Sequence, residues 1–548
     1  MSFKNFYFSA TEPKLSRSWS YFILCLGLIL LAIIRFRFIY VPLERDEGEY
    51  AYMGQLILQG IPPYKLAYNM KLPGIYFMYA FLMQIFGESI RGIHLGFLIV
   101  NLSSVILLYL IFKKFMNEIL TVIFALMYGL YSTSPYVLGF AFHATHLVLL
   151  FFLISFLLFL DYVEKDKSIS LYLSGIFLGI SFLMKQQGIF LILFLFLYLF
   201  YFNLSKRLRF KNILLNQFLF GLFIIFPFII SLFYLFNKGV ISEFYFWTFS
   251  YASKYVSITS MSEGFQNLIN TIKILSYGYK VFWYLFPLGV LFYIFSNENI
   301  LNKILLLSLL FFSFLTTVPG FYFREHYFIS FLPFLLFFSF KSIEYLFQKI
   351  YFKIKTKLGI LFLVLFFIFS VRNSIYTFKS YYLKDDPNKI SRTVYGANPF
   401  IEAISISKYI KENSKLSDQI FVFGSEPEIY FYSNRKSTTG YIYMYPLMEP
   451  HPYSLEMQKK LVTTALKSKP KFIVLVNPEL NFSWGITDKS HPYLVNWLKD
   501  TFVKTAYTPI LRYEIIDLLN TITIDKDLYL TKPKSKYYIE LYELILQD

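Results

Sequence analysis

Long apolar runs separated by short polar stretches fill the first two thirds of the chain. A membrane-spanning helix needs roughly 20 mostly apolar residues, and about eleven runs approach that length. They lie near 19–41, 92–112, 118–138, 143–160, 168–184, 188–203, 213–236, 277–296, 304–319, 327–341 and 358–371. No small-residue cleavage site follows the first run, so we interpret it as an uncleaved anchor. The pattern predicts a polytopic α-helical membrane protein.

One long polar break, residues 44–74, interrupts this pattern directly after the first run. It places Asp46, Glu47 and Glu49 just past the end of a span, and Lys71 follows in the same loop. Parts of the wider loop show apolar residues at helical spacing, which predicts short helices along the membrane surface. The loop therefore brings carboxylates and a cation together at one face of the membrane.

The pattern changes near residue 373, where the apolar runs shorten to strand length. Such runs occur at 419–424 and 471–476, with segments of helical character between them. This alternation predicts an α/β fold with a partly parallel sheet. We expect a transmembrane catalytic domain, 1–372, whose first outer loop, 42–90, carries the active site, and a soluble C-terminal domain, 373–548.

The formal charge of +18 would suggest a nucleic-acid partner in a soluble protein. Here, however, many basic residues lie in alternate short loops, where they orient helices in the bilayer. These residues are Lys113, Lys114, Lys165, Lys167, Lys206, Arg207, Arg209, Lys211, Lys303, Lys341, Lys349, Lys353, Lys355 and Lys357. The bias predicts eleven spans with the N-terminus in the cytoplasm and the C-terminal domain outside, and no nucleic-acid partner.

Two arginines and one cysteine lie in the first apolar run. Arg35 and Arg37 oppose the charge bias at its outer end, and we expect them to snorkel to headgroups or to face a lipid phosphate. Cys25 is the single cysteine, which excludes an intramolecular disulfide.

The first outer loop also resembles a known family. DEGEYAYMGQLILQG, PPY and KLPG, in that order, are similar to the first outer loop of the GT-C glycosyltransferases. The likeness is closest to the bacterial branch with the aminoarabinose transferase of lipid A modification and the protein O-mannosyltransferases. It continues in FGESIRGIHL, GISFLMKQQGIFLI, REHYFISFLPFLL and, in the tail, FVFGSEPEIYFYSNRK.

The resemblance implies a GT-C fold in the bacterial inner membrane, with a periplasmic C-terminal domain. It further implies an inverting transfer of a sugar from a polyprenyl-phosphate donor. The acceptor would be a hydroxyl group of a lipopolysaccharide, another envelope glycan or a protein.

This reaction requires a base for the acceptor proton and positive charge for the departing phosphate. Asp46 supplies the first and Lys71 the second. The resemblance makes Asp46 the base and gives Glu47 the binding or orientation of the acceptor. For Glu49 a solvated loop charge is the favoured interpretation.

Further residues extend the predicted site. Lys185 ends a span on the outer side, against the charge bias, and the resemblance implies that it contacts the donor phosphate. Arg324 and His326 lie in the same outer plane and could complete a phosphate clamp, because arginine forms bidentate contacts to phosphate oxygens. The residues suited to stacking on or hydrogen bonding a sugar are Tyr50, Tyr64 and Tyr68.

His143 and His146 are candidate metal ligands, because their spacing can put two ligands on one helix face. No third ligand lies nearby in the sequence. Met70 stands where the aminoarabinose transferase branch has a metal-binding glutamate, so we predict a metal-independent enzyme without a cofactor. We assign structural roles to Arg91 and His94.

Two other readings of the sequence differ in what they require. A lipid-linked sugar transporter or flippase should place ionisable groups near mid-membrane, whereas here they lie at one face. An oligosaccharyltransferase acting on asparagine should carry a Trp-Trp-Asp motif in its tail. The nearest stretch, Ser483-Trp484-Gly485, is not a substitute.

Overall fold

The computed structural model describes residues 17–351, 356–502, 507–517, 520–525 and 532–544. The chain divides into two compact units. One, here called the bundle unit, comprises Met1–Phe38, Leu95–Phe233 and Thr259–Lys384. The other, here called the loop–tail unit, comprises Ile39–His94, Tyr234–Ile258 and Asp385–Asp548. The first outer loop and the C-terminal tail therefore belong to one compact body.

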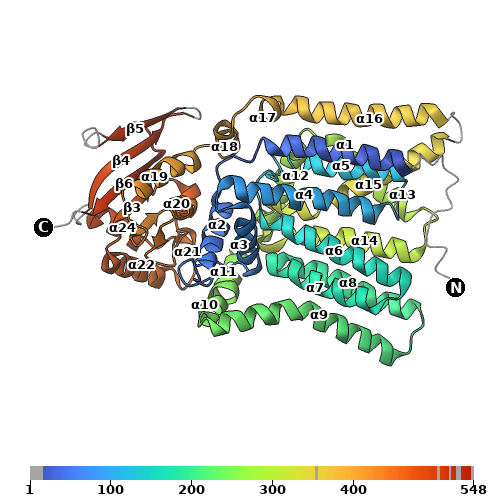
Figure 1. The fold of residues 1–548 in the computed structure, drawn as a ribbon, viewed down its shortest axis with the longest axis horizontal. Helices are drawn as coiled ribbons and strands as arrows, with labels where there is room; N and C mark the ends of the chain where they lie inside the picture. Colours follow the sequence, from blue (N-terminus) through green and yellow to red (C-terminus); the bar gives the residue numbers. More distant parts are fainter. Residues whose placement is uncertain (1–16, 352–355, 503–506, 518–519, 526–531, 545–548) are drawn as a thin grey trace. The chain divides into compact units, whose positions relative to one another are not determined.

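The bundle unit is built of helices (Figure 1). Those that lie wholly or mostly in it are α1 (Arg17–Phe36), α4 (Ile90–Phe112), α5 (Glu118–Tyr131), α6 (Ala144–Lys165), α7 (Ser168–Met184), η2 (Gln186–Gly188), α8 (Ile189–Ser205), α9 (Phe210–Asn237), α12 (Met261–Ser276), α13 (Lys280–Ile294), α14 (Ile300–Leu315), η4 (Pro319–Phe321), η5 (Glu325–Ser330), α15 (Leu332–Tyr351), α16 (Thr356–Thr377) and α17 (Lys379–Leu383).

Each predicted apolar run coincides with one of these helices. Among the described residues, five helical segments are long and apolar enough to cross a membrane, and the pair α12 and α13, bent by 115°, makes a sixth candidate. The five are Ser18–Phe36, Ile90–Phe112, Ala144–Lys165, Gln186–Ser205 and Phe210–Asn237. The prediction of a polytopic helical membrane protein is confirmed, whereas the count of eleven spans stays a prediction.

Two predicted runs differ from the helices that form. The run 118–138 yields a helix that ends at Tyr131. Pro135 follows shortly after, and a proline disfavours the helical conformation of the residue before it. The run 327–341 begins with the 3₁₀ turn η5, and the α-helix itself starts at Leu332. Both differences lie at helix ends, where sequence patterns are least informative.

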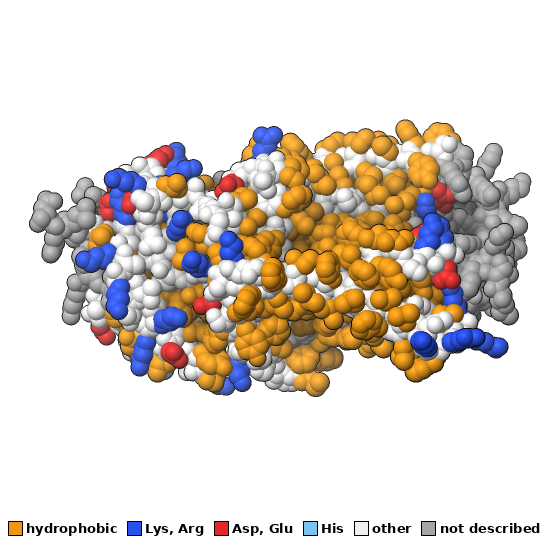
Figure 2. Space-filling model, turned by 60° about the horizontal axis from the view of Figure 1, so that its bottom comes forward, with side chains coloured by type: hydrophobic (Ala, Val, Ile, Leu, Met, Phe, Trp, Pro, Cys, Tyr) orange, Lys and Arg blue, Asp and Glu red, His pale blue; other side chains and the backbone are white. Residues whose placement is uncertain are grey.

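Small residues allow close helix packing inside the bundle unit. A Cβ atom added to Gly179 of α7 would lie 2.1 Å from the carbonyl oxygen of Ile224 on α9, and one on Gly175 would lie 3.0 Å from Cβ of Phe223. Glycine at such a spacing lets two backbones approach, as in many membrane helix pairs. The outer side of α9 is apolar and exposed, and Figure 2 shows a broad field of hydrophobic side chains with charged side chains gathered at its end.

Contacts place several lysine-bearing loops at one end of the bundle unit. Lys114 pairs with Glu164, and Lys206 lies 3.3 Å from Asp166. The Asn117 amide donates to Glu344, which also pairs with Lys341. These loops were predicted to share the cytoplasmic side, and the contacts bring them to a common end.

The loop–tail unit begins with two helices, α2 (Arg45–Leu58) and α3 (Gly74–Phe86). A capping box starts α2: the Glu44 carboxylate accepts from the Glu47 amide at 3.0 Å, and Glu47 accepts from the Glu44 amide at 3.4 Å. Two orphan amide donors are thereby satisfied. The box also places Asp46 in the first turn of the helix.

The remainder of this unit is a six-stranded sheet with helices (Figure 1). The strands are β1 (Gln419–Phe423), β2 (Lys436–Ser437), β3 (Phe472–Val476), β4 (Tyr507–Ile515), β5 (Thr521–Asp525) and β6 (Tyr538–Leu544), in the order β2-β1-β3-β6-β4-β5. β1 pairs in parallel with β2 and β3, whereas β3, β6, β4 and β5 pair antiparallel in that order. The predicted strands became β1 and β3.

Short helices complete the unit. They are α10 (Ile241–Tyr245), the π-helix η3 (Phe246–Tyr251), α11 (Ala252–Val256), α18 (Pro387–Tyr395), α19 (Phe400–Glu412), α20 (Glu428–Ser433), α21 (Tyr445–Met448), α22 (Ser454–Ser468), α23 (Asn481–Trp484) and α24 (Tyr493–Asp500). Their apolar sides join the sheet in a core that contains Trp484, whose ring nitrogen donates to the Val476 carbonyl at 3.0 Å. Trp484 is thus a core residue of the tail.

Candidate functional site

The polar stretch 44–74, here called the acidic loop, closes on itself through Lys71. Its ammonium nitrogen lies 2.9 Å from Oδ1 of Asp46 and 2.7 Å from Oε2 of Glu49. The nitrogen also lies 4.5 Å from the centre of the Tyr50 ring, within reach of a cation–π contact. Helix α2 supplies Asp46, Glu49 and Tyr50, and the segment after the Pro-Pro turn returns Lys71 to them. The predicted carboxylate and cation are therefore one constellation.

Burial separates the two carboxylates. The side chain of Glu49 is fully buried, whereas that of Asp46 is 29% exposed and that of Lys71 12%. A partly exposed carboxylate can reach a substrate, and a buried one can only hold its neighbours. Of the two carboxylates that contact Lys71, Asp46 is the accessible one.

The charges in this constellation depend on one another. Burial alone would lower the pKa of Lys71, but the attraction of Asp46 and Glu49 outweighs it and holds the pKa well above its ordinary value. Burial raises the pKa of Glu49, and Lys71 offsets part of that rise. Lys71 therefore remains a cation at neutral pH.

Tyrosine hydroxyl groups complete the shell around Glu49 and Lys71. Tyr76 donates to Oε1 of Glu49 at 2.7 Å, and Tyr64 donates to the Lys71 carbonyl at 2.7 Å. Tyr50 and Tyr64 are almost fully buried, so they hold the loop in its conformation. Their predicted contact with a sugar stays a prediction.

Tyr68 lies in a different environment. It is partly exposed and stacks on Trp247 of η3, with ring centroids 5.2 Å apart and an interplanar angle of 19°. The Tyr68 amide donates to the carbonyl of Gly440 in the tail. Of the three tyrosines suggested for a sugar, this one has the exposed face that such a contact needs.

Glu47 is held from two sides. Its carboxylate accepts from the Glu44 amide in the capping box, and Oε1 lies 3.0 Å from Nε2 of His94. Its side chain is 2% exposed. These contacts favour a structural role for Glu47, and its predicted binding of the acceptor stays a prediction. His94 is buried against Glu47 and Arg91 is exposed, and the structural roles suggested for both stay predictions.

Other predicted site residues lie in the bundle unit. Lys185 ends α7, and its ammonium nitrogen lies 4.0 Å from the centre of the Tyr327 ring. His326 is buried and its ring stacks on that of His143, with centroids 4.1 Å apart, whereas Arg324 is exposed. Lys185, which follows α7, and His326 of η5 therefore both lie next to Tyr327.

His143 and His146, which were considered as metal ligands, do not form a pair on one helix face. His143 precedes α6 and stacks on His326, whereas His146, inside α6, packs against Phe97 with ring centroids 4.5 Å apart. A zinc site usually takes three protein ligands or more. The i,i+3 pair by itself does not supply them.

The structure corrects the interpretation of Arg35. Its guanidinium does not snorkel: it is 4% exposed, donates to the Gly139 carbonyl at 3.2 Å and to the Ser132 hydroxyl at 3.0 Å, and lies over the ring of Phe97. The loop after α5 offers polar partners that the apolar pattern could not reveal. Arg35 ties α1 to that loop.

Two residues near the site, Tyr443 and Arg45, were not predicted from the sequence. The hydroxyl of Tyr443 lies 3.0 Å from Oε2 of Glu49, and Arg45 pairs with Glu426 at 2.9 Å. Arg45 adjoins Asp46 in the loop motif, which is a local signal. Tyr443 carries no signal, because it is 394 residues from its partner.

The chain is similar to known membrane glycosyltransferases, in part of its sequence and in its fold. A family model described as dolichyl-phosphate-mannose-protein mannosyltransferase matches residues 70–231. A second, described as the C-terminal domain of the putative competence-induced protein Ccs4, matches residues 401–489. No curated protein matches the sequence significantly.

Two solved structures are similar to nearly the whole of this chain. ArnT from Cupriavidus metallidurans, bound to undecaprenyl phosphate, has 13% identity and a TM-score of 0.56, over 95% of this chain and 100% of that one. The oligosaccharyltransferase AglB from Archaeoglobus fulgidus, in complex with an inhibitory peptide and a dolichol-phosphate, has 12% identity and a TM-score of 0.56, over 95% and 75%. The predicted resemblance to the GT-C glycosyltransferases is confirmed, and at these identities the structures establish the fold.

Proposed function

We propose that this protein is an inverting glycosyltransferase that moves a sugar from a polyprenyl-phosphate donor to a hydroxyl group of an envelope glycolipid, glycan or protein. The observation that carries the proposal is the pairing of a partly exposed carboxylate, Asp46, with a less exposed ammonium, Lys71. One residue of the pair can accept a proton, and the other can meet a phosphate.

The chemistry follows from these two groups. Asp46 takes the proton of the acceptor hydroxyl as its oxygen bonds to the anomeric carbon of the sugar. The bond from that carbon to the phosphate oxygen breaks at the same time, so the configuration inverts and polyprenyl phosphate leaves. Lys71 offsets the charge that develops on the leaving phosphate.

The remaining roles extend this proposal. Lys185, Arg324 and His326 contact the donor phosphate, and Tyr50, Tyr64 and Tyr68 contact the sugar. Glu47 orients the acceptor. The lipid phosphates bound by the similar ArnT and AglB support a lipid-phosphate donor. We also propose that the transfer needs no metal ion.

The proposal places the protein in the bacterial inner membrane with eleven spans and the loop–tail unit in the periplasm. A cysteine at Lys408, whose side chain is 76% exposed, tests this in a Cys25→Ser background. An impermeant maleimide should label Lys408→Cys in intact spheroplasts. Lys167→Cys, exposed at the other predicted side, should label only after lysis. The reverse result would overturn the topology and the periplasmic site.

A deletion strain tests the activity. Mass spectrometry of its envelope glycolipids and glycoproteins should show the loss of one sugar mass, and the wild-type gene should restore it. Asp46→Asn, expressed to the same level, should not restore it. A lipid-linked sugar transporter would instead give restoration by both genes.

A further inference from the structure

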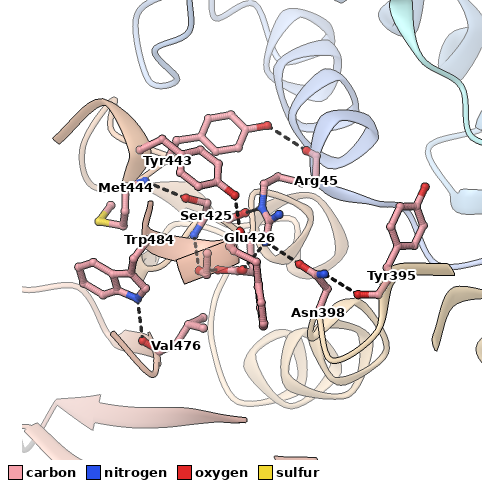
Figure 3. Close-up of polar contacts among 12 residues, drawn as sticks. Arg45, Tyr395, Asn398, Ser425, Glu426, Tyr443, Met444, Val476 and Trp484 are labelled. Carbon is pink, nitrogen blue, oxygen red and sulfur yellow. Dashed lines mark hydrogen bonds and ion pairs between the residues drawn. The ribbon is translucent and has the colours of Figure 1, made fainter. Parts of the chain in front are cut away.

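One contact between the tail and the acidic loop is made by a tyrosine hydroxyl group. The hydroxyl of Tyr443 lies 3.0 Å from Oε2 of Glu49. It also lies 3.0 Å from the carbonyl oxygen of Arg45, a contact drawn in Figure 3. A tyrosine hydroxyl carries one proton, so it donates to one of these acceptors at a time. The residue is 5% exposed and comes from the stretch after β2. The contact is thus a buried one between the tail and α2.

Glu49 depends on such contacts. Its carboxylate is fully buried, and a buried charge is costly unless it is paired and hydrogen-bonded. Tyr76 satisfies Oε1, while Lys71 and Tyr443 share Oε2. Removing the Tyr443 hydroxyl would leave Oε2 to Lys71 alone, and Lys71 would be drawn towards Glu49 and away from Asp46.

A second contact fixes the same turn of α2. Arg45 donates to the Ser425 carbonyl, to Oε1 of Glu426 at 2.9 Å and to Oδ1 of Asn398 at 3.1 Å (Figure 3). Bonds to a charged guanidinium are among the stronger ones in proteins. Three tail residues therefore hold the side chain next to Asp46.

The two contacts are joined inside the tail. The Met444 amide, next to Tyr443, donates to the Ser425 hydroxyl at 2.9 Å. The Ser483 hydroxyl in turn donates to Oε2 of Glu426 at 2.9 Å and accepts from the Ser425 amide. The segment that carries Tyr443 and the loop that binds Arg45 thus form one hydrogen-bonded network (Figure 3).

We propose that Tyr443 is a positioning residue of the glycosyl transfer, which acts through Glu49 to hold Lys71 between the two carboxylates, and that the tail is part of the catalytic centre. The proposal rests on the proposed function and deepens it. The tail would then be required for each turnover.

Tyr443→Phe tests the proposal, because it removes only the hydroxyl group. Loss of a hydrogen bond to a charged group predicts a fall in kcat/KM of roughly tenfold or more. Donor KM should rise and kcat should fall together, since Lys71 would contact the phosphate both before and during transfer. A structural contact would reduce the yield of folded protein and leave kcat and KM of the folded fraction unchanged.

Tyr430→Phe is the matched control. Tyr430 is also a buried tyrosine of the tail, but its hydroxyl accepts from the Val422 amide at 2.9 Å, within the tail. Phenylalanine would keep its ring stacked on Tyr52. Both variants should lose similar thermal stability, and only Tyr443→Phe should change the kinetics. Equal kinetics in the two variants would overturn the proposal.

A double variant tests the route through Glu49. In a Glu49→Gln background, Tyr443→Phe should cost much less than tenfold, because the shared oxygen no longer carries charge. The same cost in both backgrounds would show that Tyr443 does not act through Glu49. If wild type and Asp46→Asn transfer sugar equally, the proposed function fails. If they differ and Tyr443→Phe behaves as Tyr430→Phe, only this inference fails.

Discussion

Helices α2 and α9 both depart from the burial pattern of a water-soluble protein. Helix α2 buries charged residues, and helix α9 exposes large apolar ones. In α2, ten consecutive residues from Glu47 to Leu56 are buried, two glutamates among them. In α9, by contrast, Phe218 and Phe233 are each 67% exposed. Exposed phenylalanines on a long apolar helix are stable in lipid, and buried glutamates are stable only with partners.

The comparison separates what the membrane requires from what the chemistry requires. The bundle unit has apolar surface and few partners for charge along its length. The loop–tail unit uses tyrosines, an arginine and a lysine to keep carboxylates buried near Asp46. Burying its polar network is costly, and the proposed reaction would give that geometry a purpose. The predictions below test this division.

The largest effect is expected at Asp46. Asp46→Asn keeps the shape of the side chain and removes its ability to accept a proton. Turnover should fall by roughly 10²–10⁴-fold, the usual contribution of a general base, while donor lipid remains bound. Initial rates and binding of polyprenyl phosphate to the purified variant measure both. A rate near that of the wild type would exclude Asp46 as the base.

Lys71→Ala should act on binding as well as on rate. It removes the charge that meets the phosphate, and a charge-assisted bond contributes about 1.5–3 kcal/mol, roughly 10- to 100-fold in affinity. Donor affinity and turnover should fall together. Lys65→Ala, an exposed lysine of the same loop, is the control and should change neither. Unchanged donor affinity in Lys71→Ala would remove Lys71 from the phosphate site.

How much of this could be predicted from sequence differs between the two units. The helices of the bundle unit follow from apolar runs, because local composition alone determines what can lie in lipid. The pairing of Asp46 with Lys71 was also predictable, since both lie in one loop with a known resemblance. In each case the signal is short-ranged.

The supporting residues were not predictable, because their partners are distant in the sequence. Glu49 appears as one more loop acid, yet Tyr443, 394 residues away, satisfies its carboxylate. For Glu47, likewise, the sequence did not reveal that the capping box and His94 engage both of its oxygens. Burial of a polar group depends on tertiary contacts, which a single sequence does not reveal.

A smaller effect is expected at Lys185 in the bundle unit. Its ammonium group lies over the Tyr327 ring, and because a cation over a tyrosine gains about 0.5–2 kcal/mol, the ring already stabilises part of its charge. Lys185→Ala should therefore weaken donor binding by about tenfold or less and change turnover less than Lys71→Ala does. Lys167→Ala, at the other end of α7, is the control. A loss of turnover as large as that in Asp46→Asn would place Lys185 in the chemistry and break the division between the two units.

The smallest effect is expected from chelation. Lys71 already contacts the carboxylates of both Asp46 and Glu49, and a thioether such as Met70 is a poor ligand for hard divalent ions. Activity in detergent should therefore survive prolonged treatment with a chelator at full strength. Rates before and after chelation, and after addition of Mg²⁺, Mn²⁺ or Zn²⁺, give the measurement. Loss of activity that one of these ions restores would contradict the prediction. His143→Ala would then show whether the imidazole that stacks on His326 is a ligand, because the variant should no longer respond to the added ion.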